Sequence, residues 1–427
     1  MSKGLEEYTI LVPDMCHIHF SLLKNLFADY GYNLKVLTNQ SRAVVDEGLM
    51  HVHNDTCYPA LLVIGQMIDA LKSGEYDLDK TALMITQTGG GCRASNYIHL
   101  LRKALHKAGY GNIPVFSVNA SGLEKGDAIK LSFQKIRKAF AVMTYGDMLM
   151  LLANQTEPYD SEDGATQRLV QAWIDRLDME FKLNKGFSLP QVRTNLKKMA
   201  SDFAALPLQQ IKKIKVGIVG EIYVKYSSLG NNNLEKFLKE QGCEVMVPGL
   251  LGFIYYCVDN RLEDIRLYGG TWLKKFVITK AMNKLLSFEK AIMEAVMPYR
   301  QFTPPLPFYK MKALAKDIIG YGVKMGEGWL LTAEMLELNE HGYENIVCAQ
   351  PFGCLPNHIV GRGMIRKIRS LYPNSNIVPI DYDPGATKVN QENRIKLMLA
   401  LAKEAMEKKQ PVAMPRCVLE TVHEQVV

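Results

Sequence analysis

The chain has 427 residues, of which 48% are hydrophobic and 22% are charged, a balance typical of a folded globular protein. A chain of this length exceeds what one hydrophobic core ordinarily supports, so we expect two or more domains. The 51 basic and 44 acidic residues give a formal net charge of +7. Without a Lys/Arg block interleaved with aromatic residues, this mild charge indicates no nucleic-acid partner.

Neither export nor membrane insertion is predicted. The N-terminal stretch MSKGLEEYTILVPDM lacks a long apolar segment followed by a cleavage site, so we expect no signal peptide. No uninterrupted run of about 18 apolar residues occurs, so we expect no membrane-spanning helix and no membrane partner. These features predict a cytoplasmic protein, and in that compartment the eight cysteines are not expected to form a disulfide framework.

The first part of the chain alternates strand and helix patterns. Apolar runs predict strands at residues 8–14, 33–39, 81–88 and 113–119. Helical periodicity lies between them, at residues 18–30, 59–72 and 93–111. This βαβ alternation predicts a parallel sheet with helices on both faces.

A helical segment at residues 127–210 separates this first lobe, residues 1–126, from a second α/β block at residues 211–427. The second block contains a helical insertion at about residues 259–340. Its strands are predicted within residues 211–224, 243–249, 345–353 and 375–383. The sequence therefore predicts an α/β protein with two Rossmann-like or flavodoxin-like lobes, parallel sheets and helical insertions.

Three of the eight cysteines share one local setting, a loop directly before a predicted helix. They are Cys57 in NDTCYPA, Cys92 in GGGCRAS and Cys354 in PFGCLPN. Pro59 and Pro356 stand where proline is favoured in the first turn of a helix. Cys92 and Cys354 also follow a predicted strand and at least one glycine. This places them beyond the carboxyl ends of strands, where ligands bind in open α/β sheets.

The N-termini of helices explain why cysteines in this setting suit metal chemistry. Free N–H groups and the positive end of the helix dipole stabilise a thiolate and an anionic iron–sulfur core. Gly90 and Gly91 would let the backbone approach such a core. Arg93 and Asn96 are candidate donors to its sulfides or to an anionic substrate. Simpler interpretations stay open: the cysteines as small buried residues, and Arg93 and Asn96 as solvated side chains of a first helical turn.

The other five cysteines give weaker signals. Cys16, in PDMCHIH, also lies between a predicted strand and a helix and is a fourth, weaker candidate ligand. Cys348 lies inside the apolar run NIVCAQ, which predicts burial in a sheet. Cys243, Cys257 and Cys417 have no such glycine or proline context and are predicted to be structural. No CxxC pair occurs, so the spacings typical of zinc ribbons and ferredoxins are absent.

Five segments carry a resemblance to a known family. In chain order, HNDTCYPA, GGGCRASNY, GIVGEIYV, CAQPFGCLPNHIVGRGM and NIVPIDYDPGATKVNQENRIKLML resemble the 2-hydroxyacyl-CoA dehydratase superfamily. The dehydratase-like domain often fused behind an ATP-dependent activase is the most similar type, and the resemblance spans about residues 8–405. It implies a [4Fe–4S] cluster between the lobes, ligated by Cys57, Cys92 and Cys354, with the fourth iron left open. In double-cubane relatives a sulfide joins two such cubanes into an [8Fe–9S] cluster.

The same resemblance implies a function. Such proteins receive one electron at low potential from a separate activase that hydrolyses ATP, and they dehydrate a 2-hydroxyacyl-CoA or reduce a small molecule. This chain has neither a GxxxxGK[ST] loop nor an acidic-Gly-Ser/Thr phosphate loop, so a partner is expected to supply the ATP hydrolysis. A homo- or hetero-dimer is also expected. Two alternatives stay open: a double-cubane reductase of small molecules, and a non-catalytic binding or scaffold module that uses the cluster structurally or lacks it.

Two further residues are candidates for proton transfer. Glu221 ends the strand VGIVGE at the edge where ligands bind in such lobes, so its carboxylate could act as an acid or base beside an open iron. His358 lies four residues after Cys354, one helical turn on, and could reach toward the cluster. The alternatives are a strand-end or helix-capping role for Glu221 and a place on the helix surface or in the core for His358.

Overall fold

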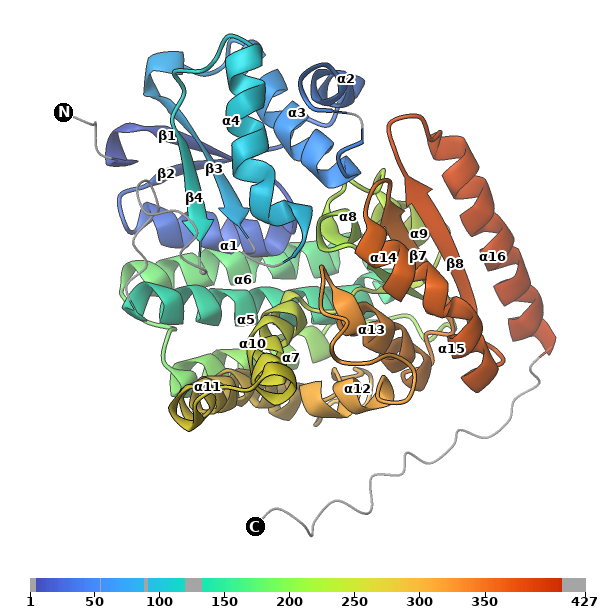
Figure 1. Ribbon diagram of the computed structural model, residues 1–427. Helices are drawn as coiled ribbons and strands as arrows, with labels where there is room; N and C mark the ends of the chain where they lie inside the picture. The colour runs from blue at the N-terminus through green and yellow to red at the C-terminus, as the bar shows by residue number, and fades with distance from the viewer. Residues whose placement is uncertain (1–4, 54, 88–90, 120–132, 409–427) are drawn as a thin grey trace.

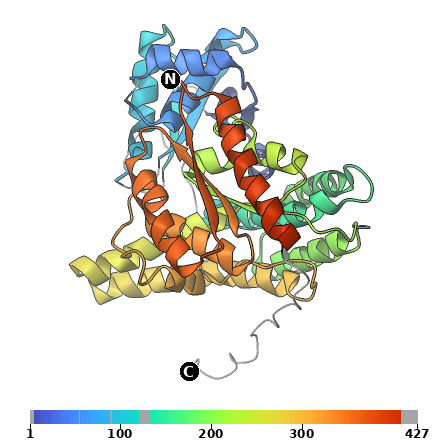
Figure 2. The same cartoon turned by 90° about the vertical axis from the view of Figure 1, so that its right-hand side faces the viewer.

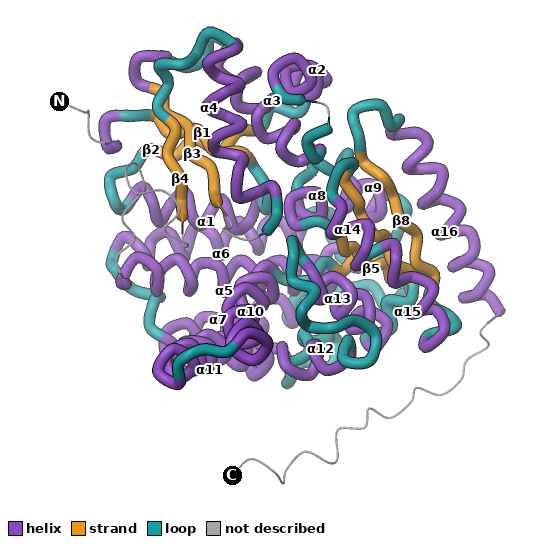
Figure 3. Tube along the Cα trace, viewed as in Figure 1, coloured by secondary structure: helices purple, strands orange, loops and turns teal. Residues whose placement is uncertain are grey.

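Two four-stranded sheets, each entirely parallel, form the centres of two lobes. Figure 1 and the orange strands of Figure 3 show the two sheets as separate groups. The computed structural model describes residues 5–53, 55–87, 91–119 and 133–408. Each of the eight predicted strands forms, so the α/β class with two Rossmann-like or flavodoxin-like lobes is confirmed.

The N-terminal lobe has the strand order β2-β1-β3-β4. Its strands are β1 (Thr9–Pro13), β2 (Asn33–Leu37), β3 (Thr81–Gln87) and β4 (Val115–Asn119). Its helical elements are η1 (Leu5–Glu7), α1 (His17–Ala28), α2 (Arg42–His51), α3 (Tyr58–Lys72), η2 (Leu78–Lys80), η3 (Arg93–Asn96) and α4 (Tyr97–Lys107). Ile10 and Val12 of β1 pack on the side of α1, whereas Leu11 packs with α3 and α4. Helices therefore cover both faces, as a parallel sheet requires.

The C-terminal lobe repeats this plan with the strand order β6-β5-β7-β8. Its strands are β5 (Lys215–Gly220), β6 (Glu244–Met246), β7 (Asn345–Pro351) and β8 (Asn376–Tyr382). Its helical elements are α8 (Ile222–Tyr226), α9 (Leu234–Glu240), α14 (Leu355–Val360), η5 (Arg362–Met364), α15 (Ile365–Leu371) and α16 (Lys388–Lys408). Helix α16, red in Figure 2, lies along the outer side of this sheet.

A helical layer lies against both lobes. It contains α5 (Phe133–Thr156), η4 (Glu157–Tyr159), α6 (Ala165–Lys182), α7 (Leu189–Ala204), α10 (Leu250–Tyr268), α11 (Trp272–Val296), α12 (Phe308–Leu314) and α13 (Gly328–Glu340). One buried apolar cluster joins these helices to α1 of the N-terminal lobe and to β7 of the C-terminal lobe. None of the helices in the described ranges is both long and apolar enough to cross a membrane.

Helix α2 was not among the predicted elements. Its interior contains Gly48, which lowers its intrinsic helix propensity. Glycine at position 48 allows close contact with α3. A Cβ atom on Gly48 would lie 2.4 Å from the carbonyl oxygen of Leu61 in α3. A Cβ atom on Gly65 of α3 would lie 2.0 Å from the carbonyl oxygen of Val44. Two facing glycines therefore let α2 and α3 pack backbone to backbone, and this tertiary contact outweighs the local propensity.

The strand orders give each lobe a topological switch point. In each lobe the connections after the two central strands leave in opposite directions, and ligands of open α/β sheets bind at such a point. In the N-terminal lobe the segments that follow β1 and β3 lead to Cys16 and Cys92. In the C-terminal lobe the segments that follow β5 and β7 lead to Glu221 and Cys354. A second buried apolar cluster has members from both lobes, so the lobes pack directly on one another.

Candidate metal centre

The three cysteines singled out from the sequence all occupy the position before the first residue of a helix. Cys57 precedes α3, Cys92 precedes η3 and Cys354 precedes α14. Cys57 and Cys354 are buried, whereas Cys92 is partly exposed. Proline stands in the first turn of both α3 and α14, where the missing N–H group costs no helical hydrogen bond. The predicted local setting of these cysteines is therefore confirmed.

The loops of Cys57 and Cys354 touch across the boundary between the lobes. The N–H group of Tyr58 donates to the carbonyl oxygen of Phe352 at 2.9 Å. Between Phe352 and Cys354, Gly353 has a φ of +74°, and a Cβ atom there would lie 3.1 Å from the Cα atom of Cys57. Glycine is needed at this position for two reasons, the left-handed backbone and the close approach of the other lobe.

Two side chains connect the segment of Cys92 to the loop of Cys57. Nη1 of Arg93 donates to the carbonyl oxygen of Asp55 at 3.1 Å, which connects the Cys92 segment to the loop before Cys57. The hydroxyl of Tyr97, at the start of α4, lies 2.9 Å from Sγ of Cys57 and shares a hydrogen bond with it. A tyrosine hydroxyl can donate to a thiolate, so Tyr97 can stabilise the ionised form of this ligand candidate.

The loop before α13 borders this region. A Cβ atom on Gly91 would lie 2.1 Å from Sδ of Met325, and one on Gly326 would lie 3.4 Å from Cβ of Pro356. The loop therefore touches the segments of both Cys92 and Cys354. The clearance predicted at Gly91 is used here by the Met325 side chain. Gly90 lies outside the described residues.

Two carboxyl groups face the same region. Glu221 is half-buried and precedes α8, where Oε2 accepts from the N–H group of Val224 at 2.9 Å. Glu327 is buried, and its Oε1 accepts from the N–H group of Ile222 at 2.9 Å. Burial, together with the charge of Glu327, raises the pKa of Glu221. Burial also raises the pKa of Glu327. Close acidic groups of this kind retain a proton at a higher pH than isolated ones.

The electrostatics of the three thiols link them to these carboxyl groups. Burial, together with the charges of Glu327 and Glu221, raises the pKa of Cys92 to about 11. Burial followed by the same two charges raises the pKa of Cys354. Burial also raises the pKa of Cys57, and Glu221 contributes in the same direction. The charge of Glu221 therefore acts on all three thiols, and a bound cation would be needed to favour three thiolates together.

The donor set fits an iron–sulfur cluster. Three soft sulfur ligands suit iron, and Tyr97 supplies the hydrogen bond to sulfur that such sites use. Oε2 of Glu327 is buried and has no hydrogen-bond partner among the described residues, so a group is still missing beside it. Within the described part of the chain no three His, Cys, Asp or Glu side chains converge on a single ion. In a four-iron cluster each cysteine ligates its own iron, so such convergence is not required.

The remaining predicted site residues lie around this centre without specific contacts to it. His358 is half-buried in α14, and its imidazole makes no hydrogen bond to the residues that the structure describes. Asn96 is exposed at the start of α4, and its side chain does not cap the helix. Glu221 does cap a helix, as the simpler interpretation predicts, and its other carboxylate oxygen leaves a role in proton transfer open.

Cys16 takes part in a separate buried array. Its Sγ atom lies 2.9 Å from Nδ1 of His19, and Nε2 of His19 lies 2.8 Å from Oδ1 of Asp147. The same carboxylate accepts from the N–H groups of Leu250 and Leu251 at the start of α10. Cys16 therefore contacts His19 of α1, and His19 in turn contacts Asp147 of α5. The sequence shows no pattern for this array, because Asp147 comes from a distant helix.

Two of the other cysteines, Cys348 and Cys243, are buried, which agrees with the structural interpretation, whereas Cys257 is exposed. Cys348 is fully buried in β7, and Nε2 of Gln350 lies 3.7 Å from its sulfur. Cys243 is buried just before β6, and Cys257 is exposed on α10. Cys417 lies outside the described residues.

Glu327 and Tyr97 are the residues of this centre that sequence reasoning missed. Tyr97 stands within the quoted stretch GGGCRASNY, five residues after Cys92, so its position was visible but its contact with Cys57 was not. Glu327 belongs to the sequence KMGEGW, whose two glycines mark a turn. Both of these glycines, Gly326 and Gly328, have positive φ angles, which a turn of this tightness requires.

Comparison with known proteins adds no assignment. No family model matches the chain, and no curated protein is significantly similar to it. The relation to the 2-hydroxyacyl-CoA dehydratase superfamily therefore stays a prediction, and the function has to be argued from the site.

Proposed function

We propose that this chain is an oxygen-sensitive iron–sulfur protein. It would bind a [4Fe–4S] cluster, or one cubane of a sulfide-bridged [8Fe–9S] pair, through Cys57, Cys92 and Cys354. The supporting observation is their placement, because each precedes the first turn of a helix and contacts between the two lobes bring their loops together. The N-termini of helices favour thiolates. Three protein ligands would leave one iron open, as catalytic metal sites do.

The proposed role is that of the catalytic or electron-accepting component of an ATP-driven, low-potential reductase or 2-hydroxyacyl-CoA dehydratase-like system in the cytoplasm. When bound, the cluster would supply one-electron chemistry at low potential and an open iron for a substrate atom. A separate activase would hydrolyse the ATP, because the sequence contains no P-loop and no actin-like phosphate loop. The expected assembly is a homo- or hetero-dimer.

Two acidic residues of the chain would handle protons at this site. The pKa values of Glu221 and Glu327 are both raised by burial, so one of them would hold a proton close to neutral pH. A carboxylic acid in this state can donate its proton to a leaving hydroxyl group. Glu327 has an oxygen without a partner among the described residues, so this carboxyl group is free to make that contact.

Anaerobic purification tests the proposal. The protein from iron-replete cells should be brown and contain about four iron and about four sulfide atoms per chain. Titration with a low-potential electron donor should decrease the visible absorption of the cluster. This change should be complete after about one electron per cluster. A dimer that contains about eight irons and about nine sulfides would favour the double-cubane reductase. A cluster that accepts no electron would favour the scaffold module. Colourless, iron-free protein would overturn the proposal.

A further inference from the structure

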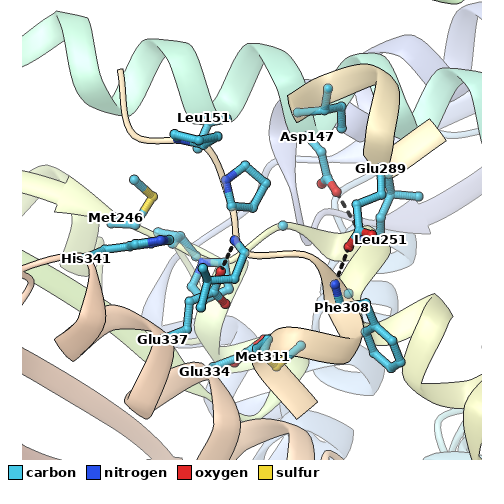
Figure 4. Close-up of a pocket in the computed structure, with 18 of the residues that line it drawn as sticks. Asp147, Leu151, Met246, Leu251, Glu289, Phe308, Met311, Glu334, Glu337 and His341 are labelled. Carbon is cyan, nitrogen blue, oxygen red and sulfur yellow. Dashed lines mark hydrogen bonds between the residues drawn. The ribbon is translucent and has the colours of Figure 1, made fainter. Parts of the chain in front are cut away.

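A cavity of about 100 Å³ lies in the helical layer, away from the candidate metal centre. Its walls come from α5, α10, α11, α13 and the segment at residues 303–308, and none of the three candidate cysteine ligands lines it. Most of the lining is apolar and includes Leu151, Met246, Leu251, Phe308 and Met311. Figure 4 shows Asp147 and Glu289 toward one side of the cavity and Glu337 and His341 toward the other.

Two of the carboxyl groups at this cavity are compensated by the protein. Asp147 accepts two backbone hydrogen bonds, from Leu250 and Leu251, and it also pairs with His19. Glu334 forms an ion pair with Lys225, with Nζ 2.9 Å from Oε1. These two groups need no ligand, because each has a positively charged partner supplied by the fold.

The other two carboxyl groups have no such compensation. Oε1 of Glu289 accepts from the N–H group of Phe308 at 2.8 Å, and Oε1 of Glu337 accepts from that of Leu306 at 2.7 Å. No ion pair joins either glutamate to another of the described residues. The lining contains no lysine or arginine, and burial lowers the pKa of His341 to about 4, so this histidine is neutral. Burial raises the pKa of Glu289 to about 7 and that of Glu337 to about 8.

A buried tyrosine adds an independent sign of a missing ligand. Tyr255 lines the cavity and is only 3% exposed, and its hydroxyl has no hydrogen-bond partner among the described residues. Burial, and then the charges of Glu289 and Asp147, raise the pKa of Tyr255, so its hydroxyl lies near these two of the four carboxyl groups that line the cavity. An unsatisfied buried hydroxyl destabilises the empty cavity, and a ligand that bonds to it would remove this cost.

We propose that this cavity binds the ammonium group of a small aliphatic amine. An ammonium group has three donors and no acceptor, so it can donate to the free oxygen of Glu289 and to the Tyr255 hydroxyl on the same side of the cavity. The apolar walls would receive the alkyl chain, and the positive charge would compensate Glu289. A neutral alcohol of the same size would gain the apolar contacts but not the charge. This inference stands apart from the proposed metal centre.

The test uses the full chain and two probes of matched size, n-butylammonium and butan-1-ol, at about pH 8.5, where the amine is protonated. Saturation-transfer NMR and calorimetric titration should show saturable binding of n-butylammonium and at least about tenfold weaker binding of butan-1-ol. Glu289→Gln should weaken binding of the amine by about tenfold. Glu294→Gln is the matched control, because Glu294 lies on the same helix as Glu289 but outside the cavity and should leave the affinity unchanged.

Three results would overturn this inference. They are absence of saturable amine binding, equal affinity for the two probes, and unchanged affinity in a Glu289→Gln variant that still unfolds cooperatively. Tyr255→Phe keeps the test decisive if Glu289→Gln fails to fold, since it removes only one hydroxyl. It should weaken binding of the amine by about threefold, whereas an unchanged affinity in this variant would also count against the inference.

Discussion

Nε2 of His19 lies 2.8 Å from Oδ1 of Asp147, and this contact joins α1 of the N-terminal lobe to α5 of the helical layer. A Cβ atom on the neighbouring Gly146 would lie 2.3 Å from the imidazole ring, so the site admits the ring only because residue 146 is glycine. Asp147 is also anchored by two N–H groups at the start of α10. The pair therefore connects three parts of the fold through buried polar groups.

This contact makes the stability of the protein depend on pH. Burial alone would lower the pKa of His19, but the interactions with Cys16 and Asp147 outweigh it and raise this pKa to about 10. The unfolded chain releases the same proton near pH 6.5. The stabilisation from His19 is therefore complete below about pH 6.5 and is lost as the pH rises toward 10.

His19→Gln tests this dependence. The free energy of unfolding of the wild type should exceed that of His19→Gln most at low pH. The difference should shrink by roughly 1 kcal/mol for each pH unit above the unfolded pKa. Denaturant titrations at a series of pH values measure both proteins. A difference that stays constant across this range would contradict the assigned charge state of His19.

Loss of one partner of the buried ion pair between α8 and α13 should strongly lower the free energy of unfolding. Lys225 in α8 and Glu334 in α13 are 5% and 3% exposed. Glu334→Gln leaves the ammonium group of Lys225 buried without its charged partner, so the free energy of unfolding should fall by about 3 kcal/mol. Glu240→Gln breaks the exposed pair with Lys236 and should change it by less than about 1 kcal/mol. Equal losses in the two variants would contradict this account.

The close contact at Gly353 gives a prediction about the boundary between the lobes. Gly353→Ala must place a Cβ atom 3.1 Å from the Cα atom of Cys57 in a left-handed backbone, so it should lower both stability and iron content. Gly74→Ala is the matched control, because Gly74 has a similar φ of +77° and its Cβ atom would meet nothing within 4 Å. In the control the free energy of unfolding should fall by only about 1 kcal/mol, the cost of placing alanine in a left-handed backbone conformation. Similar unfolding free energies and iron contents in both variants would argue against a tight fit at Gly353.

The sequence predicted the sheets well because of their burial. Strands such as β5 and β7 are buried on both faces, so their sequences are mostly apolar. Such strands can be recognised from the sequence without knowing which segments they contact in the fold. The positions of Cys57, Cys92 and Cys354 before helices were also predictable, because proline, glycine and the end of a strand are local signals. These signals do not show which loops meet in space.

Contacts between distant segments account for what the sequence did not reveal. Helix α2 depends on the facing pair Gly48 and Gly65. Its intrinsic helix propensity is weak, so the sequence alone did not predict this helix. Glu327 approaches the site from a loop far along the chain, and Asp147 reaches His19 across 128 positions. Side-chain pairs of this kind leave no periodic pattern. A single sequence therefore predicts the strands and caps of this protein better than its buried polar arrays.

The central claim is that Cys57, Cys92 and Cys354 together hold an iron–sulfur cluster, and the iron and sulfide content of serine variants tests it most directly. All proteins would be purified anaerobically from iron-replete cells. Cys57→Ser, Cys92→Ser and Cys354→Ser should each lose most of the iron and sulfide, because each removes one of three ligands. Cys243→Ser and Cys257→Ser, outside the site, should retain the wild-type content. Wild-type iron and sulfide in any of the three ligand variants would contradict the claim.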